Sequence, residues 1–149
     1  MAIGWAKRSK SLDSEPVHPT VFARRINAIV GALTKARKVL KDEIAPLRIH
    51  VNAGDLVRIG RVANECLAAF DEARWILKST PAPIGAEPCT DSLMAWLEMH
   101  VDACDALCRA SGTRNSRHIE TAQDLLRQAN THAHTFNRHR RLVVERVAA

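Results

Sequence analysis

The amino-acid sequence predicts an all-α protein, an antiparallel up-down-up-down four-helix bundle preceded by a flexible N-terminal arm. Apolar residues recur in alternating steps of three and four along four stretches, which is the spacing of one helix face. Only 4% of the residues are aromatic and tyrosine is absent, so Ala, Leu, Val and Ile carry the apolar content. That composition favours close-packed helices over a sheet. Mostly short connections between long helices favour antiparallel neighbours.

The 149 residues are enough for one domain with its own core. Residues 1–18 mix Ser, Lys, Pro and Gly without a period, so we expect a flexible basic arm there and the bundle over 19–149. The first helix is predicted to begin at Pro19–Thr20 with Thr20 as its N-cap, and to end at Ala45–Pro46. Its apolar stripe consists of Phe22, Ile26, Ile29, Leu33, Ala36 and Leu40.

The remaining three helices follow from the same periodicity. The second begins after Asn52, and a linker with three prolines, KSTPAPIGAEP, separates it from the third. The third is expected to end at Ser111–Gly112, and the fourth to begin near Asn115 or Ser116. The apolar positions of the second helix are Leu56, Ile59, Ala63, Cys66, Phe70, Ala73 and Leu77. Those of the third helix are Leu93 or Met94, Leu97, Val101, Cys104 and Cys108. Those of the fourth helix, interrupted only by Arg140, are Ile119, Ala122, Leu126, Ala129, Ala133, Phe136, Val143 and Val147.

The stretch HVDACDALC places His100, Cys104 and Cys108 on one side of the third helix. Antiparallel neighbours that meet at their loops bring Cys66 level with Cys104 and His118 level with Cys108, because each residue rises about 1.5 Å. Three thiolates and one imidazole suit zinc or copper(I). The favoured interpretation is nevertheless a buried core, since free cysteine is among the most buried residue types. Cys89, in the linker, is expected to be the most exposed thiol.

Two short motifs resemble those of known families. The pair Cys104 and Cys108, one turn apart, resembles the bacterial copper-storage bundles, which line their core with such pairs and for which copper binding is implied. The segment RQANTH resembles the Arg and His signature of the HEPN ribonucleases, which are also helical bundles. That second resemblance implies RNA cleavage with Arg127 and His132 at the site.

Basic residues are expected to gather at one end of the bundle. The chain carries a net charge of +6, and antiparallel packing brings the start of the first helix to the ends of the second and fourth. Such an end could contact a phosphate backbone, with binding that weakens as salt rises. Cations at a helix C-terminus also have a structural role, because they complement the helix dipole. The candidate patch for an anion or nucleic acid is Arg24, Arg25, Arg138, Arg140 and Arg141, near Arg74, Lys78, Arg146 and the arm residues Lys7, Arg8 and Lys10.

Composition and motifs together favour a non-enzymatic binding or interaction module. The sequence contains no Gly-rich phosphate loop and no Gly-x-Ser-x-Gly elbow. It has neither the apolar region of a signal peptide nor a run of about 18 apolar residues, so we expect a cytoplasmic protein without membrane contact. The excess of 16 Arg over 6 Lys is typical of GC-rich bacteria.

The ligand is not specified by any of these patterns. Trp5 and Trp75, both expected to be exposed near the basic end, indicate a protein partner or a homodimer, because tryptophan is enriched at interfaces. No cofactor is required by this interpretation. The alternatives are a zinc- or copper-binding bundle through Cys66, Cys104, Cys108 and His100 or His118, and an RNA-binding protein or HEPN-like ribonuclease.

Overall fold

The computed structural model describes residues 17–48 and 51–148 of the chain. Over these residues the protein is all-helical, with 84% helix, five α-helices, one π-helical turn and no strand. The predicted arm over residues 1–18 lies outside the described residues, except for Val17 and His18. None of the described helices is long and apolar enough to cross a membrane.

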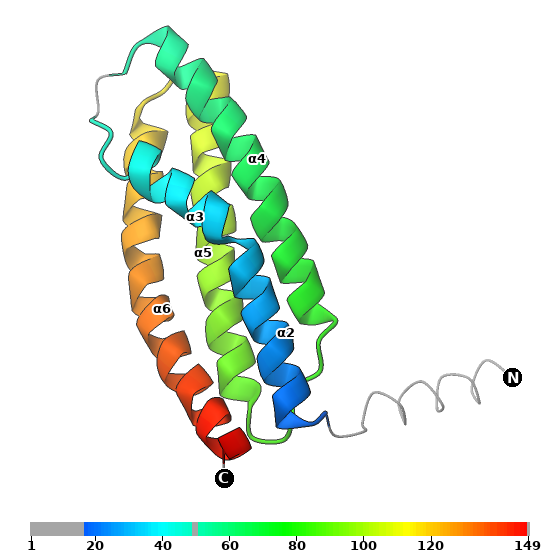
Figure 1. Ribbon diagram of the computed structural model, residues 1–149. Helices are drawn as coiled ribbons and strands as arrows, with labels where there is room; N and C mark the ends of the chain where they lie inside the picture. The colour runs from blue at the N-terminus through cyan, green and yellow to red at the C-terminus, as the bar shows by residue number, and fades with distance from the viewer. Residues whose placement is uncertain (1–16, 49–50, 149) are drawn as a thin grey trace, which may run out of the picture.

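Three long helices, α4 (Ala53–Lys78), α5 (Glu87–Thr113) and α6 (Arg117–Ala148), lie side by side (Figure 1). Helix α5 runs opposite to the other two and contacts both. Helix α2 (Pro19–Ala32) packs against α4 and α6 in the lower half of the view in Figure 1, and α3 (Thr34–Val39) leans away from it. The π-helical turn η1 (Leu40–Ile44) completes this first, broken segment.

The prediction of one continuous helix between Thr20 and Ala45 is wrong, because this stretch forms α2, α3 and η1. The helix is interrupted at Leu33. Beside this interruption, the Thr34 hydroxyl donates a hydrogen bond to the Gly31 carbonyl at 3.0 Å, a type of side-chain bond that competes with the helical backbone bonds. Farther on, the Ala45 amide donates to the Leu40 carbonyl at 2.9 Å, the five-residue step of a π-helix. The apolar stripe survives both irregularities, since all six of its predicted members are buried.

The N-cap of this segment is His18 and not Thr20. The His18 Nδ1 accepts a hydrogen bond from the Thr20 amide at 3.1 Å, and Pro19 occupies the first helical position. Proline suits that position because its fixed φ is helical and its missing N–H would have no helical partner.

Helix α4 follows its prediction closely. The Asn52 side chain accepts from the Asp55 amide at 2.8 Å and so caps the helix. All seven predicted apolar positions are buried. On the face toward α5, Gly60 comes so close to Ser111 that an added Cβ would lie 2.3 Å from the serine Oγ.

Helix α5 is longer and more widely buried than predicted. It begins at Glu87, within the predicted linker, and ends at Arg114 in a left-handed conformation (φ 56°) rather than at Gly112. Because α5 packs between two long helices, its buried face is broader than one stripe and includes Trp96, His100 and Leu107. Val101 and Cys108, both predicted to be core residues, are only half-buried.

Helix α6 begins where the sequence predicts, after Asn115, whose side chain accepts from the Arg117 amide at 3.0 Å. Most of its stripe is buried, but Leu126 and Ala133 are only half-buried. Both face a depression between α6 and the broken first segment. Val147, near the end of the helix, is exposed.

Candidate functional site

A cavity of about 460 Å³ separates α3 and η1 from α6, and α5 forms its floor. A smaller cavity of about 200 Å³ continues it toward α2 and shares Arg37, Trp96 and Ala133 with it. We call this combined depression the α3–α6 groove. The larger cavity is lined by Thr34, Arg37, Lys38, Leu40, Lys41, Asp42, Ala45, Trp96, His100, Gln123, Leu126, Arg127, Asn130 and Ala133; the smaller adds Val30, Phe136, Asn137 and Arg140.

The floor of the groove rests on an aromatic cluster. Trp96 and His100 lie one turn apart on α5, with ring centroids 4.4 Å apart. Beneath them, Phe70 of α4 stacks on His100 at 4.5 Å and meets Trp96 edge-on at 5.9 Å. Because all three rings are buried, this floor is rigid and almost wholly apolar.

His100 is a neutral side chain in this setting. Its Nδ1 lies 2.8 Å from the Trp96 carbonyl, which can only accept, so Nδ1 carries the proton and Nε2 the lone pair. Burial lowers the pKa of His100 to about 4; the bond to the Trp96 carbonyl works in the opposite direction, and nearby Arg37 lowers the pKa further. The imidazole therefore adds no charge to the floor at neutral pH.

The rim of the groove is strongly basic. Arg37, Lys38, Lys41 and Arg127 line the larger cavity, against one acidic side chain, Asp42. Lys38 pairs with Asp42 at 3.3 Å, and Arg127 pairs with Asp124. Both pairs are exposed, and exposed ion pairs are weak enough for an anionic ligand to compete with them.

Arg37 connects the rim to the floor. Its guanidinium lies over the Trp96 ring, 5.2 Å from the centroid, which is a cation–π contact. Arg140 sits similarly over Phe136, at 5.3 Å, in the smaller cavity. The two arginines are thus held beside the groove by aromatic faces rather than by carboxylates.

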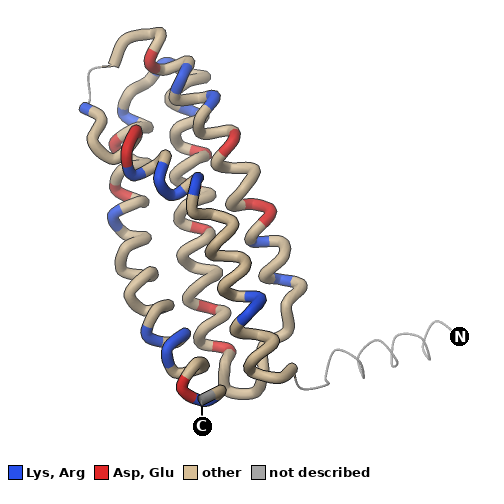
Figure 2. Tube along the Cα trace, viewed as in Figure 1, with Lys and Arg blue, Asp and Glu red and all other residues tan. Residues whose placement is uncertain are grey.

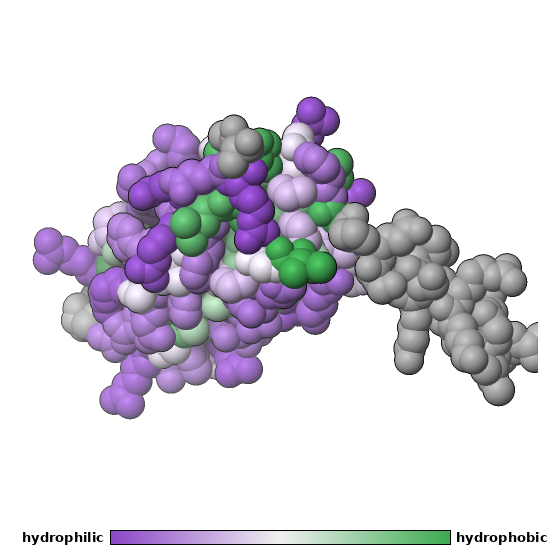
Figure 3. Space-filling model, turned by 90° about the horizontal axis from the view of Figure 1, so that it is seen from below, coloured by the Kyte–Doolittle hydropathy of each residue, from purple (hydrophilic) through white to green (hydrophobic). Residues whose placement is uncertain are grey.

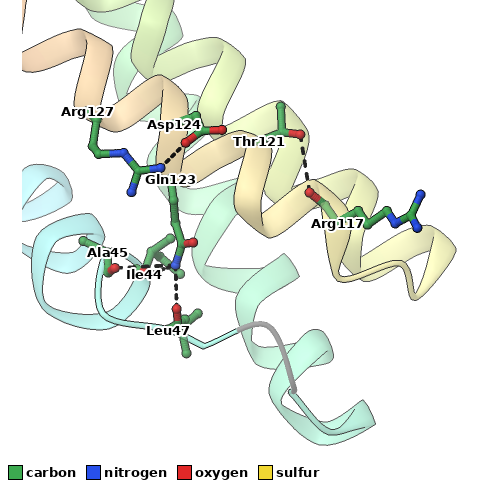
Figure 4. A network of polar contacts seen from close by, with 8 residues as sticks. All are labelled: Ile44, Ala45, Leu47, Arg117, Thr121, Gln123, Asp124 and Arg127. Atoms are coloured by element: carbon green, nitrogen blue, oxygen red, sulfur yellow. Dashed lines mark hydrogen bonds and ion pairs between the residues drawn. The ribbon is translucent and has the colours of Figure 1, made fainter.

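Gln123 ties α6 to the opposite wall of the groove (Figure 4). Its side-chain amide donates to the Leu47 carbonyl at 2.7 Å and to the Ile44 carbonyl at 3.2 Å, with the Ala45 carbonyl at 3.5 Å. The Ile44 carbonyl, at the end of η1, also accepts from the Leu47 amide at 3.1 Å, whereas the Leu47 carbonyl lies just beyond the turn. The tie therefore joins α6 to the end of η1 and to the residues that follow it.

This groove is not among the predicted sites. Of its lining residues, Arg127 and His100 are predicted for other sites, whereas Arg37, Lys41, Trp96 and Gln123 belong to none. Two sequence signals point to parts of it: Trp96 and His100 have the four-residue spacing of one helix face, and Thr34 stands three residues after Gly31 in the predicted first helix.

Of the candidate metal ligands, Cys66 and Cys108 lie near Cys104, but they are not arranged as a metal site. Among the described residues no three His, Cys, Asp or Glu side chains lie where they could hold a metal ion. The Cys66 thiol instead contacts the Ala36 carbonyl at 3.9 Å, and the Cys108 thiol donates to the Asn64 side chain at 3.3 Å. His100 donates to a backbone carbonyl, and His118 is half-buried near the start of α6.

The thiols have the electrostatics of protonated core side chains. Burial raises the pKa of Cys66 to about 11, and the charges of Glu65 and Glu43 add to the effect. Burial also raises the pKa of Cys104, and the nearby Cys66 and Cys108 raise it further. Thiolates are the form that binds metal, so this environment disfavours the ligating state.

The prediction that Cys89 is the most exposed thiol is wrong. It lies in the first turn of α5 with 2% of its surface exposed, because the helix begins inside the predicted linker. Burial raises the pKa of Cys89 to about 11, although Arg140 lowers it. Cys108 is the thiol that is only half-buried.

Arg127 and His132 do not share a site. The described groove lining includes Arg127 but not His132, which is half-buried elsewhere on α6. Five residues along a helix turn the two side chains roughly 140° apart. The structure thus places one member of the HEPN-like pair at the groove and the other away from it.

The predicted basic end is divided between two surfaces. Figure 2 shows basic positions on the lower parts of α2, α4 and α6, with acidic positions among them. Arg24, Arg25, Arg138 and Arg141 are exposed there, whereas Arg140 is half-buried and lines the smaller cavity of the groove. Arg146 donates to the Ile84 carbonyl at 2.8 Å and so ties α6 to the connection before α5. Lys7, Arg8 and Lys10 lie outside the described residues.

The same end also exposes apolar side chains. Trp75 is 69% exposed, as predicted, while Trp5 lies outside the described residues. Seen from this end, Figure 3 shows separate apolar areas within a largely hydrophilic surface. The large apolar side chains exposed on the parts of the elements near this end are Val21, Trp75, Ile76, Ile84, Leu142, Val144 and Val147, whereas Val57 is exposed near the opposite end of α4.

The chain matches no protein-family model, and neither a curated protein nor a solved structure is significantly similar to it.

Proposed function

We propose that the protein is a non-enzymatic binding module, an up-down-up-down four-helix bundle that binds an anionic ligand in the α3–α6 groove. In this proposal α2, α3 and η1 together act as the first helix, and its break opens the groove. The observation that carries the proposal is the charge of the lining: four basic side chains against one acidic one around a cavity of about 460 Å³.

The lining favours binding over catalysis. His100 is the described lining residue whose ordinary pKa lies closest to neutrality, and burial lowers that pKa to about 4. With this pKa the imidazole is a weak base, whereas a general base works best when its pKa lies near the operating pH. A neutral floor and a basic rim suit the retention of an anion, because charges on the rim steer it into the groove.

The proposal is tested by following backbone amide signals in NMR while inorganic pyrophosphate is added at low salt. We expect shifts along 37–42 and 123–130, the segments that line the groove. Arg127→Gln should weaken binding about fivefold, since one weakly paired cation is lost. Arg109→Gln is the matched control: Arg109 forms the same kind of exposed ion pair, with Asp105 at 3.0 Å, but lies outside the groove lining. Shifts confined to 138–141 would overturn the proposal in favour of the basic end.

The alternatives are separated on the same preparation. RNA binding that falls steeply with salt and is unaffected by Arg127→Gln would support a nucleic-acid function of the basic end. Zinc or copper retained in stoichiometric amount would support the thiol site. A protein partner or a homodimer is supported by the exposed apolar side chains around Trp75, and sedimentation at several protein concentrations tests the homodimer.

A further inference from the structure

We infer that the ligand of the α3–α6 groove is a small organic anion with an aromatic or aliphatic body, rather than an inorganic ion or a polymer. This inference rests on the proposed function and adds the chemical class of the ligand. Three features of the lining support it: the size of the cavity, the separation of its charged and apolar parts, and the absence of charge on its floor.

The size of the cavity fits a small molecule. Small-molecule sites typically occupy about 300–1,000 Å³, and the larger cavity has about 460 Å³. An inorganic phosphate would fill only a minor part of that space and leave the rest to water. The tie from Gln123 to the Leu47 carbonyl, 2.7 Å long, joins the two walls at one side of the cavity and limits how far a polymer could extend along it.

The charged and apolar lining residues come from different parts of the groove. Lys38 and Lys41 from the first segment and Arg127 from α6 stand at its rim, and all three are exposed. Deeper in the groove lie Leu40 and Trp96, which are buried, and Leu126 and Ala133, which are half-buried. A ligand with an acidic group at one end and an apolar body at the other matches both parts at once.

The half-buried apolar side chains provide the reason for an organic body. Leu126 and Ala133 are predicted core residues of α6 that no other helix covers fully. An apolar ligand body would complete their burial, which an inorganic ion cannot do. The neutral His100 beside Trp96 leaves this part of the groove without a charge that such a body would have to desolvate.

Phenyl phosphate, inorganic phosphate and benzyl alcohol separate the contributions of body and charge. In isothermal titration calorimetry we expect phenyl phosphate to bind at least about tenfold more tightly than inorganic phosphate, because the ring buries apolar surface. We expect benzyl alcohol, which has the ring without the charge, to bind at least about tenfold more weakly than phenyl phosphate. Arg127→Gln should weaken the binding of both phenyl phosphate and inorganic phosphate.

Two variants on neighbouring residues test the apolar part. Leu126→Gln should reduce phenyl phosphate binding to the level of inorganic phosphate and leave inorganic phosphate unchanged. Leu125→Gln is the matched control, since Leu125 is also half-buried but is not part of the groove lining. Circular dichroism and thermal unfolding of each variant establish that the fold is retained.

Each outcome separates the inference from the proposed function. Equal affinities for phenyl phosphate and inorganic phosphate, both reduced by Arg127→Gln, would overturn the organic ligand and retain an anion-binding groove. Benzyl alcohol binding as tightly as phenyl phosphate would overturn both, because the groove would then have no preference for an anion. Failure of all three probes to bind would also overturn both.

Discussion

His100 illustrates at the scale of one residue how packing determines chemistry. Its ring stacks on Phe70 at 4.5 Å, and its Nδ1 lies 2.8 Å from the Trp96 carbonyl. With 7% of its surface exposed, it cannot be hydrated as an imidazolium. The folded protein therefore holds His100 neutral, whereas the unfolded chain protonates it with an ordinary pKa.

This difference predicts a loss of stability in acid. The pKa of His100 is about 4 in the folded protein and 6.5 in the unfolded chain, so between these values the unfolded chain binds the extra proton. The contribution is fully present above pH 6.5 and is lost as the pH falls toward 4, by about 3 kcal/mol in total. Denaturant unfolding measured at several pH values from 7.5 to about 4 tests this expectation.

Two histidine variants isolate the effect. His100→Gln should be destabilised at neutral pH, where it loses the ring stack, yet should lose less stability than the wild type on acidification. His134→Gln is the control for replacing a histidine, because His134 is exposed on α6. An identical pH dependence in the wild type and His100→Gln would contradict the assignment.

The cysteines show how far sequence reasoning reaches for single residues. Cys66 and Cys104 fall on apolar stripes and are buried as the favoured interpretation predicts. Cys89 is misplaced because the prolines around it were interpreted as a linker, whereas Pro88 lies in the first turn of α5. Proline is tolerated there for the same reason that it breaks a helix interior, namely its missing N–H.

At the scale of the elements, Gly60 marks a close approach of α4 and α5. A Cβ at this position would lie 2.3 Å from the Ser111 Oγ and 2.6 Å from its Cβ. The Oγ can rotate away, but the Ser111 Cβ cannot, because it is bonded directly to the backbone of α5. The two helices can therefore pack at this distance only if one of them lacks a side chain.

We predict that Gly60→Ala destabilises the protein by about 1–3 kcal/mol, the usual effect of overpacking, although alanine favours helix formation. Gly31→Ala is the matched control, because no atom lies within 4 Å of its added Cβ. This variant should raise the free energy of unfolding by roughly 0.5–1 kcal/mol. Thermal unfolding measures both changes. Adding Ser111→Gly to Gly60→Ala should recover part of the loss, and no recovery would contradict the contact.

The elements were predictable to different degrees. In α4 the cap, the periodicity and the burial all agree, so Asn52 and the seven apolar positions are predicted correctly. The first segment has equally regular periodicity, but it is interrupted beside the Thr34 bond to Gly31 and again at the π-helical turn. Periodicity is insensitive to such breaks, because the stripe remains buried through them.

At the scale of the whole molecule, the tie from Gln123 holds α6 and the first segment together around the groove. Its acceptors are the carbonyls of Ile44 and Leu47, at 3.2 Å and 2.7 Å. The groove lining combines residues from α3, η1, α5 and α6, with Gln123 itself among them. Stability and ligand binding should therefore depend on the same contact.

We predict that Gln123→Leu lowers the free energy of unfolding by about 1 kcal/mol, because the part-buried Leu47 carbonyl loses the Gln123 amide as its donor. The amides of Ile44, Ala45, Leu47 and Arg48 should exchange hydrogen faster, since this end of the segment would open locally. Gln128→Leu is the control, as Gln128 is exposed on α6. Hydrogen exchange and denaturant unfolding test both effects, and unchanged exchange in 44–48 would contradict the tie.

The sequence carries signals for the floor of the groove and for the break beside it, but not for the groove itself. Each helix shows its own apolar face, but the depression depends on how the broken first segment leans relative to α6 (Figure 1). Arg37 and Lys41 look like ordinary surface residues until Trp96 and Arg127 are placed opposite them. Periodicity specifies which face of a helix is buried, and it carries no information on where two faces fail to meet.

The tie from Gln123 also has a consequence for the order in which the chain acquires its shape. Its hydrogen bonds to Ile44 and Leu47 span 79 and 76 residues, so neither can form on the ribosome until most of the chain has emerged. Contacts this distant in sequence form late, after local helices have appeared. A nascent chain that ends before α6 therefore contains the basic residues of α3 and η1 and the aromatic residues of the floor, but it lacks the wall that α6 provides. The capacity to bind a ligand in the groove arises only as synthesis nears completion.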